Sequence, residues 1–570
     1  MDKKTKEIIR KYAIKNAIEY GKASTSAVLN KVISVMPELK SDIKTLAKDV
    51  ESVVREVNLL SSEEIKDEFN ANLEEFNAAR REKVEKTARP RMVLDGATEG
   101  NFATRFPPEP NGYMHIGHAK AVFLEEAFKE IYKGKLFLYF DDTNPETERQ
   151  EYVDAIKYDL SWLGIKFDKE YYASDSIEIM YKYAEEMIRK GGAYVCTCSG
   201  EQIKADRKAG RPCVHKSNTK AENLQMWSEM LSGRLDEDAA VLRFNGDMKS
   251  QNTAMRDLVL FRIKKSRHYK QADKYFVWPT YSFNTPIMDS INGVTDVIRS
   301  KEYELRDELY YSILDILGLE KPRVHSMARL EIFGNITSKR KLNQLIKSGV
   351  IAGYDDPRLI TIAGLRRRGI TPSAIKKFVL RFGMSKTDSK VGIDMLLAEN
   401  RKVIDSTSKR LFAVEDRRVL RIEETHPEDV KLKMHPTLDL GYREYKVGNT
   451  LYIDGRDAEK LSPGDLIRLK DLYDVSILST GSEIRARRVE SHKNLPKIQW
   501  VDAQKNVECK LIRISPPMLQ NGEFNEKSLV ETKAYAEEYV KNVKENEIVQ
   551  FERIGFFKLD NKSEMSFLSL

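Results

Sequence analysis

Two histidines three positions apart form the motif with the clearest chemical potential in this chain. His115 and His118 flank an Ile-Gly pair directly after a turn rich in proline and glycine. Residues 101–106 before the turn read as a short buried strand, and residues 121–134 after it read as an amphipathic helix. The histidines are therefore expected at a strand-to-helix junction, where free backbone N–H groups and the helix dipole favour a bound phosphate. Two imidazoles there can donate hydrogen bonds to a reacting phosphate, although a helix start with two surface histidines would leave the same motif.

A basic loop downstream could meet the same phosphate groups. The stretch NITSKRKL, residues 335–342, places Lys339 and Arg340 side by side. Together with the histidine motif, it resembles the two signatures, HIGH and KMSKS, of class I aminoacyl-tRNA synthetases, in the form that glutamyl and glutaminyl enzymes use. Ile336 stands where the first signature lysine would be, so the resemblance leaves Lys339 to meet the ATP phosphates, with Arg340 as a helper.

A second string matches the KMSKS signature more closely by eye. It is GMSKTD, residues 383–388, in a stretch that reads as a helical connector. The residues around NITSKRKL fit the family far better than those around GMSKTD. We therefore predict that Lys339, and not Lys386, serves ATP.

Three of the four cysteines fall close together. Cys196 and Cys198 form one tight pair, and Cys213 with His215 forms a second. Two such pairs joined by a short loop can surround one tetrahedral Zn²⁺ through thiolate and imidazole ligands. Ordinary reduced cysteines are the alternative, whereas a disulfide is not expected because nothing suggests export. We therefore predict a structural zinc site, while Cys509 stands alone and is expected to pack as a small apolar residue.

The elements that must position the histidines form a βαβ unit. The segment KLFLYF, residues 135–140, reads as a second strand that ends in Asp141 and Asp142. Ligands of such sheets bind at the carboxyl ends of the strands, which is where Arg105 and Asp141 fall. The unit has no G-x-G-x-x-G, so a dinucleotide site is not expected.

The rest of the chain divides into further parts. Residues 1 to about 90 read as helical, and residues 77–91 read as a charged connector. Residues from about 190 to 275 look inserted into the sheet pattern, and residues 345–405 read as mostly helical. From about 410 onward, short alternating segments separated by turns suit antiparallel barrels. An apolar stripe with helical spacing near the N-terminus is expected to face a core or a docking partner; it consists of Ile43, Leu46, Val50, Val53 and Val57.

Length and composition set limits on the class of protein. A chain of 570 residues is too long for one core and suggests roughly three to five domains. Charged residues make up 32% and hydrophobic residues 41%, which is ordinary for a soluble protein. No apolar run of about 18 residues and no signal peptide are present, so we expect a cytoplasmic protein without a membrane span. The net charge of +8 permits nucleic-acid binding without proving it, and basic clusters are spread as a large RNA footprint would need; they lie at 262–270, 365–369, 417–421 and 485–488.

Nearly the whole chain resembles the archaeal–eukaryotic glutamyl-tRNA synthetases and the related glutaminyl enzymes. Besides the two signatures, the resemblance is carried by YFDDTNPETE, WPTYSF, RLEIF and DDPRLITIAGLRRRG in the expected order. It implies an α/β multidomain fold in which a Rossmann-like class I synthetase catalytic domain holds an inserted acceptor-stem-binding domain. The implied boundaries are 1–95 for a helical N-terminal domain and linker, 96–190 and 276–345 for the two halves of the catalytic domain, 191–275 for the insertion with the Cys/His cluster, 346–408 for a helical connector, and 409–570 for anticodon-binding β-barrels.

The resemblance also implies a reaction. Glutamate and ATP would form glutamyl-adenylate with the help of Mg²⁺, and the glutamyl group would then pass to the 3′ end of tRNA(Glu). The implied catalytic residues are His115, His118 and Lys339. The implied ATP-binding residues are Glu109, Pro110, Asn111, His115, Gly117, His118, Ser300, Arg329, Leu330, Thr337, Ser338 and Lys339. The implied contacts to the amino acid are Arg105, Asp141, Tyr281 and Arg299.

Arg299 is predicted to select glutamate over glutamine. Glutamyl enzymes are similar to this chain in carrying Arg here, while glutaminyl relatives carry an uncharged residue. A buried guanidinium pairs bidentately with a γ-carboxylate, and an amide cannot return that charge. For Asp141 and Arg105, a structural ion pair at the strand ends is the alternative. Two departures from the family lie nearby, because Asp296 stands where it usually has His and Ser282 where it usually has Asp.

Two other functions remain as alternatives. The first is a glutamine–tRNA ligase, which Arg299 disfavours. The second is a non-catalytic tRNA-binding relative, which the intact His115, His118, Lys339 and Asp141 disfavour. The sequence does not decide whether tRNA(Gln) is charged as well as tRNA(Glu). We expect a monomer, and we expect adenylate formation to require bound tRNA, as it does in close relatives.

Overall fold

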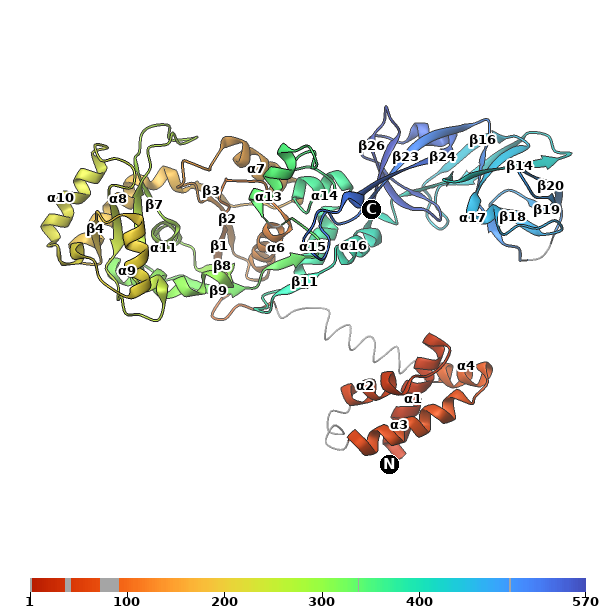
Figure 1. The fold of residues 1–570 in the computed structure, drawn as a ribbon, viewed down its shortest axis with the longest axis horizontal. Coiled ribbons are helices and arrows are strands. Elements are labelled where there is room, and N and C mark those ends of the chain that lie inside the picture. Colours follow the sequence, from red (N-terminus) through yellow and green to blue (C-terminus); the bar gives the residue numbers. More distant parts are fainter. Residues whose placement is uncertain (1–2, 36–42, 72–91, 337, 492–493) are drawn as a thin grey trace. The chain divides into compact units, whose positions relative to one another are not determined.

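The computed structural model describes residues 3–35, 43–71, 92–336, 338–491 and 494–570. The chain divides into two compact units, residues 1–90 and 91–570, which are treated separately here (Figure 1). Within the described ranges, no helix is both long and apolar enough to span a membrane.

The N-terminal unit is a small helical bundle, as the sequence predicts. Its helices are α1 (Lys3–Tyr20), α2 (Thr25–Val35), α3 (Ile43–Asn58) and α4 (Ser62–Ala71). Four members of the predicted apolar stripe on α3 are buried in the core of the bundle. The fifth, Ile43, is 45% exposed at the first residue of the helix, so it lies outside that core. The predicted connector at 77–91 lies outside the described residues.

The second unit begins with the predicted βαβ unit. Strands β1 (Ala103–Phe106), β2 (Lys135–Phe140) and β3 (Lys169–Tyr172) form a parallel sheet in the order β1-β2-β3. Helices α6 (Ile116–Ile131) and α7 (Gln150–Leu163) connect the three strands and bury their apolar faces against them. The strand and the helix that flank the histidine motif are therefore confirmed.

Two later strands form a separate two-stranded sheet that lies beside β1. Strands β8 (Asp296–Ser300) and β9 (Arg323–Met327) pair in parallel, and the Thr295 N–H donates to the Ala103 carbonyl at 2.9 Å. That bond places β8 beside β1, opposite β2. From β1 the chain continues to β2 and β3 on one side, and it later places β8 and β9 on the other side. In folds of this kind the ligand site lies at the carboxyl ends of the strands where the strand order reverses.

The segment between the two halves forms a sheet of its own. Strands β4 (Ala193–Cys196), β5 (Val241–Phe244), β6 (Val259–Ile263) and β7 (Val277–Pro279) pair in the antiparallel order β4-β5-β6-β7. One apolar core joins this sheet to its own helices and to helices of the catalytic half. These helices are α8 (Ile177–Arg189), α10 (Lys220–Leu231), α11 (Tyr281–Ile291) and α12 (Asp307–Leu317). Ile203 of helix α9 (Gly200–Ala209) packs with Tyr194 and Cys196 in a separate small cluster.

Helices dominate the part that follows the catalytic sheet. They are α13 (Lys339–Lys347), α14 (Ile362–Arg368), α15 (Pro372–Leu380) and α16 (Asp394–Ile404), with strands β10 (Leu330–Ile332) and β11 (Ser389–Val391) paired in parallel. The string GMSKTD at 383–388 is not helical, contrary to our prediction. Helix α15 ends at Leu380, and the string forms turns that lead into β11.

The C-terminal part consists of two seven-stranded sheets. In each, the two edge strands follow one another in the chain with one residue between them, so each sheet curls until its edges nearly meet. The first sheet contains β12 (Lys409–Leu411), β13 (Ala413–Val414), β23 (Asn506–Ile514), β24 (Leu529–Glu537), β25 (Ile548–Phe551), β26 (Gly555–Asn561) and β27 (Ser566–Ser569). The second contains β14 (Arg417–Glu423), β17 (Thr450–Asp454), β18 (Leu466–Leu469), β19 (Asp474–Ser479), β20 (Glu483–Val489), β21 (Lys497–Ile498) and β22 (Trp500–Asp502).

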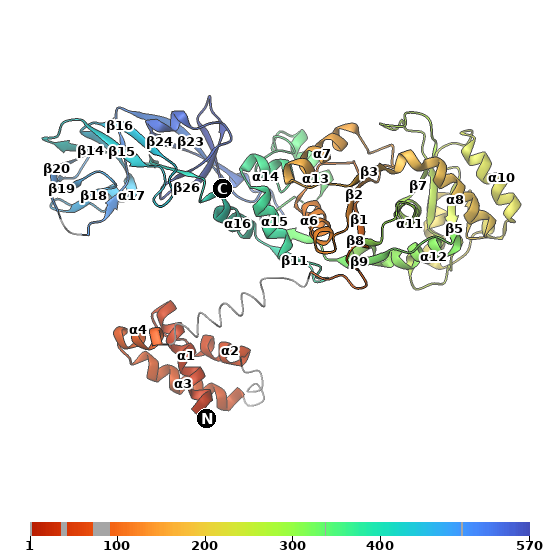
Figure 2. The same cartoon turned by 180° about the vertical axis from the view of Figure 1, so that it is seen from behind.

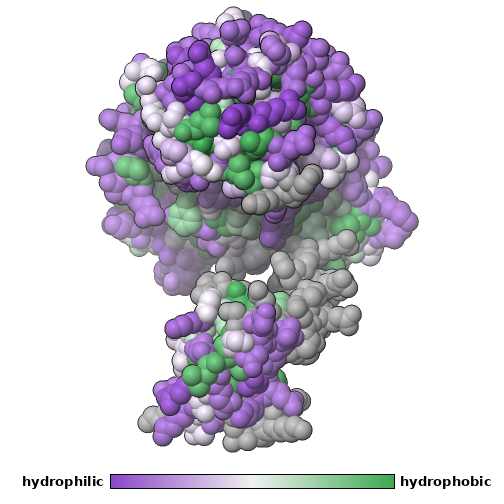
Figure 3. Space-filling view, turned by 90° about the vertical axis from the view of Figure 1, so that its right-hand side faces the viewer, coloured by the Kyte–Doolittle hydropathy of each residue, from purple (hydrophilic) through white to green (hydrophobic). Residues whose placement is uncertain are grey.

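Two further elements complete this part. They are a two-stranded ribbon of β15 (Glu428–Lys433) and β16 (Tyr442–Val447), and the short helix α17 (Gly455–Ala458). The end that carries β18 to β20 faces the viewer in Figure 3, where hydrophilic residues dominate and hydrophobic residues form only small groups.

The first C-terminal sheet is attached to the helical part. In both cartoon views the C-terminus lies beside α14 and α16 (Figures 1 and 2). The buried Arg368 of α14 donates to the carbonyls of Ser569 and Ile514, and Arg367 pairs with Asp560 at 3.0 Å. The basic cluster at 365–369 therefore serves internal packing.

Candidate active site

The loop between β1 and α6 carries the two motif histidines and is fixed by backbone bonds. The Asp141 and Arg149 N–H groups donate to the carbonyls of Pro108 and Pro110 at 3.2 and 3.1 Å. His115 caps α6, because its Nδ1 accepts the Gly117 N–H at 3.0 Å. The loop therefore delivers the helix N-terminus and both histidines to the carboxyl edge of the sheet.

The same bonds fix the tautomer of both rings. His118 Nδ1 accepts the His115 N–H at 3.1 Å, and the two rings stack at 4.0 Å between centroids. Since each Nδ1 is an acceptor, the proton of each neutral ring lies on Nε2, which can donate to a ligand. Desolvation, aided by the positive charge of Arg329, lowers the pKa of His115 to about 4. Desolvation, aided by His115, lowers the pKa of His118 well below its usual range. A Cβ at Gly117 would lie 2.8 Å from the His115 ring, so the glycine makes room for that imidazole.

Lys339 contacts the loop that carries the histidines. Its Nζ donates to the Asn111 carbonyl and lies 3.5 Å from the Cβ position of Gly112. Ser338 caps the helix that Lys339 begins by accepting the Lys341 N–H. Partial desolvation by neighbouring protein atoms lowers the pKa of the Lys339 ammonium, and the negative charge of Glu109 opposes that shift. The two signature loops are thus in direct contact, with the basic nitrogen between them.

The C-terminal part supports the loop that carries Lys339. The Met518 N–H donates to the Gly334 carbonyl at 2.9 Å, and Lys341 Nζ donates to the Gly522 carbonyl at 2.9 Å. Phe524 joins the small apolar cluster around Leu342. The conformation of this loop therefore depends on the segment between β23 and β24.

The other predicted ATP-binding residues surround these loops. Ser300 ends β8, and its buried Oγ has no hydrogen-bond partner among the described residues. Arg329 forms an ion pair with Glu302, and Leu330 begins β10. Thr337 lies outside the described residues. An unpartnered hydroxyl at a strand end suits a polar ligand.

Asp141 lies directly after β2, in an acidic environment. Its Oδ1 accepts from Asn284 at 2.7 Å, and Asn284 Oδ1 accepts from the Tyr139 hydroxyl at 2.7 Å. Burial, reinforced by Glu109 and Asp142, raises the pKa of Asp141 to about 7. No described cation pairs with this carboxyl group, so a substrate ammonium could do so.

Arg105 forms a structural ion pair with Asp289, which was the predicted alternative to a contact with the substrate. Its Nε and Nη2 donate to Asp289 at 2.7 and 3.2 Å, and the Tyr310 hydroxyl also donates to Asp289 at 3.1 Å. Its Nη1 has no partner among the described residues. Only that nitrogen of Arg105 is left for a substrate.

Arg299 lies at the end of β8 with its side chain 5% exposed. It forms an ion pair with Asp307, and its Nη1 lies 3.5 Å from the Tyr281 hydroxyl. The two departures from the family also have partners. Asp296 accepts from Arg323 and lies 2.9 Å from His325 Nε2, and Ser282 Oγ accepts from Arg306 at 3.0 Å.

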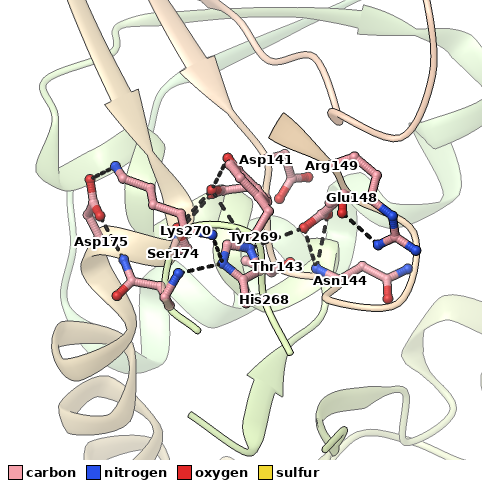
Figure 4. A network of polar contacts seen from close by, with 12 residues as sticks. Asp141, Thr143, Asn144, Glu148, Arg149, Ser174, Asp175, His268, Tyr269 and Lys270 are labelled. Atoms are coloured by element: carbon pink, nitrogen blue, oxygen red, sulfur yellow. Dashed lines mark hydrogen bonds and ion pairs between the residues drawn. The ribbon is translucent and has the colours of Figure 1, made fainter. Parts of the chain in front are cut away.

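A buried polar network fixes the loop that starts at Asp141 (Figure 4). Asp142 accepts from the Ser174 N–H and hydroxyl at 2.8 and 2.7 Å and from the Tyr269 hydroxyl at 2.7 Å. His268 Nε2 lies 3.5 Å from Glu148 Oε2, and burial, reinforced by Asp142, raises the pKa of Glu148 to about 10. Since His268 and Tyr269 precede β7, the network joins the inserted sheet to the catalytic loop.

The Cys/His cluster has the geometry of a metal site. The four candidate ligand atoms of Cys196, Cys198, Cys213 and His215 lie within 4.8 Å of one another. The Sγ atoms of Cys196 and Cys213 are 3.7 Å apart, and Cys198 Sγ is 3.5 Å from His215 Nδ1. Ligand separations of about 3.5–3.8 Å follow from tetrahedral bonds of about 2.0–2.3 Å to zinc.

Neighbours of the cluster also suit a metal. Arg243 Nη1 lies 3.7 and 3.6 Å from the sulfur atoms of Cys196 and Cys213, where a cation would favour thiolates. Thr197 Oγ1 lies 2.9 Å from His215 Nε2, the outward nitrogen that is usually hydrogen-bonded in metal sites.

Most cations of the predicted basic stretch at 262–270 have internal partners. Lys264 pairs with Glu146, Lys265 with Asp236, Arg267 with Asp273, and Lys270 with Asp175. A separate cavity of about 680 Å³ beside Cys198 is lined by other cations; they are Lys204, Arg207, Lys208 and Arg256. The sequence analysis did not select this group.

Several residues of the site were missed from the sequence. Asn284 donates to Asp141, and Asp289 pairs with Arg105. Both are buried polar residues among the apolar residues of α11, and an amide and a carboxylate in such a segment are a signal that could have found them. Glu148 and His268 carry no comparable signal, because each becomes notable only through the other.

Comparisons with known proteins agree with this geometry. Residues 101–406 match the family described as tRNA synthetases class I (E and Q), catalytic domain, and residues 408–492 and 497–560 match its two anti-codon binding domains. The glutamate–tRNA ligase of Nitrosopumilus maritimus is 41% identical over 100% of both chains. Those of Cenarchaeum symbiosum and Pyrococcus furiosus are each 40% identical, over 97% and 96% of both chains. The predicted resemblance is confirmed, and the chain belongs to the class I tRNA synthetases of the glutamate and glutamine group.

Proposed function

We propose that this protein is a glutamate–tRNA ligase, which activates L-glutamate with ATP and transfers it to the 3′ end of tRNA(Glu). One observation carries the proposal most directly, namely that Lys339 meets the histidine loop at Asn111, beside the N-terminus of α6. Helix N-termini and ammonium groups both attract phosphates. The relatives at 40–41% identity are all described as glutamate–tRNA ligases.

Adenylation needs charge stabilisation and no protein nucleophile. The glutamate α-carboxylate attacks the α-phosphorus of ATP, and pyrophosphate leaves. His115 and His118 donate Nε2–H bonds to phosphate oxygens, and Lys339 neutralises the charge that develops on the leaving group, with Mg²⁺ assisting. The 2′-hydroxyl of the terminal tRNA adenosine then attacks the acyl carbon and releases AMP.

Glutamate binds where β1, β2 and β8 end. The Asp141 carboxylate takes the α-ammonium, and Arg105 Nη1, Tyr281 and Arg299 contact the carboxylates. A glutamine–tRNA ligase is disfavoured, because guanidinium groups beside Tyr281 favour an anionic substrate.

The Cys/His cluster holds one structural Zn²⁺ in this proposal. Four protein ligands leave no open coordination position, so the metal organises the inserted sheet and takes no part in the chemistry. The basic cavity beside Cys198 contacts the phosphates of the tRNA acceptor end, since its cations have no carboxylate partners among the described residues.

The C-terminal sheets read the anticodon in this proposal, which also includes a monomeric enzyme acting in the cytoplasm. Charging of tRNA(Gln) with glutamate belongs to the proposal as an additional activity. Purified tRNA(Glu) and tRNA(Gln) should be offered separately with glutamate and with glutamine. Glutamate attached to tRNA(Glu) is the expected product. Glutamine attached in preference to glutamate would overturn the proposal, and no product with either amino acid would favour the non-catalytic relative.

A further inference from the structure

Three guanidinium groups lie around Tyr281, and their partners differ. Arg105 is paired with Asp289 and Arg299 with Asp307, and both arginine side chains are almost fully buried. In each pair the positive charge is already matched by a carboxylate. Neither pair therefore presents a net charge to a substrate that enters the site.

Arg306 is the third of these groups, and its environment is different. It ends the 3₁₀ helix η5 (Lys301–Arg306), is half-buried, and donates through Nη1 to Ser282 Oγ at 3.0 Å. Its guanidinium carbon lies 5.6 Å from the ring centroids of both Tyr281 and Tyr303. Among the residues that the structure describes, no carboxylate lies within ion-pair distance of Arg306, and its hydrogen-bond partner is a neutral hydroxyl.

The charges decide which group can distinguish glutamate from glutamine. The two substrates have nearly the same shape and differ by one negative charge. The Arg299–Asp307 pair is neutral as a unit, so a γ-carboxylate gains little more from it than an amide does. A γ-carboxylate that approached Arg299 alone would also face the negative charge of Asp307. A guanidinium without a carboxylate partner provides the missing charge and breaks no existing ion pair when it binds.

We propose that Arg306 is a specificity-determining residue, which binds the side-chain carboxylate of glutamate together with Arg299 Nη1 and the Tyr281 hydroxyl. The inference rests on the proposed placement of the amino acid beside Tyr281. The Arg306 guanidinium lies over the rings of Tyr281 and Tyr303, and Arg299 Nη1 lies 3.5 Å from the Tyr281 hydroxyl, so both guanidinium groups border Tyr281. Ser282 contributes by being neutral, because an aspartate at that position would match the charge of Arg306.

The test is a charge-exchange series measured by aminoacylation of tRNA(Glu) with glutamate and with glutamine. Arg306→Gln should lower kcat/KM for glutamate by about 10- to 150-fold, the value of a hydrogen bond to a charged group, and should change kcat/KM for glutamine less than about threefold. Arg306→Lys, which keeps the charge, should retain part of the preference for glutamate. Adding Asp307→Asn to Arg306→Gln should restore part of that preference, because it removes the carboxylate that neutralises Arg299.

Lys321→Gln is the matched control. It removes one positive charge beyond the end of α12, where Lys321 pairs with Asp315. Its ratio of glutamate to glutamine use should equal that of the unmodified protein. Melting temperatures of all variants should be compared. Asp307→Asn added to Arg306→Gln should raise the preference for glutamate over glutamine, and a misfolded protein would not show such a gain.

Three results would overturn the inference. An unchanged glutamate-to-glutamine ratio in Arg306→Gln would exclude Arg306 from selection. A rise in the KM for tRNA alone would assign Arg306 to an RNA phosphate. If Asp307→Asn did not restore any preference for glutamate in the Arg306→Gln variant, the charge argument would be wrong. Tyr281→Phe tests the placement of the amino acid beside Tyr281 separately from the role of Arg306. An unchanged KM for glutamate in that variant would reject the placement itself.

Discussion

Lys339 offers the sharpest test of the adenylation site. In Lys339→Ala, the ammonium that would meet the pyrophosphate is removed. Its present partners are neutral, namely the Asn111 carbonyl and the Tyr152 ring, whose centroid lies 5.7 Å from Nζ. Two unit charges about 4 Å apart attract by about 4 kcal/mol at an effective dielectric constant of about 20, and by about 1 kcal/mol in bulk water. Lys339 is exposed in the free protein but would be enclosed by ATP and the histidine loop. We therefore expect a loss near the upper limit, about 10²–10³-fold in rate, as for other preorganised donors.

The assay is ATP–pyrophosphate exchange with glutamate in the presence of tRNA. Lys386→Ala is the control, because Lys386 belongs to the competing GMSKTD string and pairs with Glu304 at the surface at 2.6 Å. That variant should exchange at nearly the unmodified rate. A larger loss in Lys386→Ala than in Lys339→Ala would show that the wrong loop has been assigned to ATP.

The remaining predictions concern the amino acid, the metal and the tRNA. Asp141 must be ionised to bind an ammonium, and since burial raises its pKa to about 7, kcat/KM for glutamate should fall as pH drops below about 7; a profile that stays flat down to pH 5 would contradict this. Arg299→Ala should lower kcat/KM for glutamate by about 30- to 1,000-fold, because it removes the Nη1 donor and leaves the Asp307 carboxylate unpaired beside the γ-carboxylate of the substrate. It should narrow the glutamate-to-glutamine ratio far more than it changes the KM for ATP, and an unchanged ratio measured with one tRNA would place selection elsewhere. Metal analysis of protein never exposed to chelator should find near-stoichiometric zinc, and its absence would remove the metal assignment. Pyrophosphate exchange with glutamate should stay near background until tRNA is added, and full exchange without tRNA would refute the requirement.

Local patterns predicted the elements of this molecule well where one segment determines its own structure. The strand, turn and helix around His115 follow from hydrophobic periodicity and from the Pro/Gly turn, and the sheet positions them as expected. Ile43 lies outside the core of the bundle, because a first helical residue can satisfy the spacing and still face solvent. The pattern failed at GMSKTD, because α15 already ends at Leu380 and the chain then turns through Gly383, which has a positive φ, before it enters β11.

Partners that lie far apart in the chain could not be predicted from local patterns. Asp289 pairs with Arg105, which lies 184 residues away in the sequence. His268 comes close to Glu148 only once the inserted sheet has folded. The assignment of Arg299 to a substrate carboxylate came from the family, and Asp307 could not be identified as its partner because η5 gives no clear helical spacing. Charge pairing in the folded state is therefore the part of the site that the sequence leaves open.

The contact between the β23–β24 segment and the loop of Lys339 has a consequence for how the protein can be divided. Family boundaries separate the chain near residue 407, yet Met518 and Gly522 hold the loop that would meet ATP. Ser569, next to the last residue, accepts a bond from the buried Arg368 of α14. A fragment cut at residue 407 would keep every signature residue but would lose these supports and expose the apolar surface around Leu342. The smallest piece of this chain that can be expected to preserve the ATP loop therefore extends to its final strand.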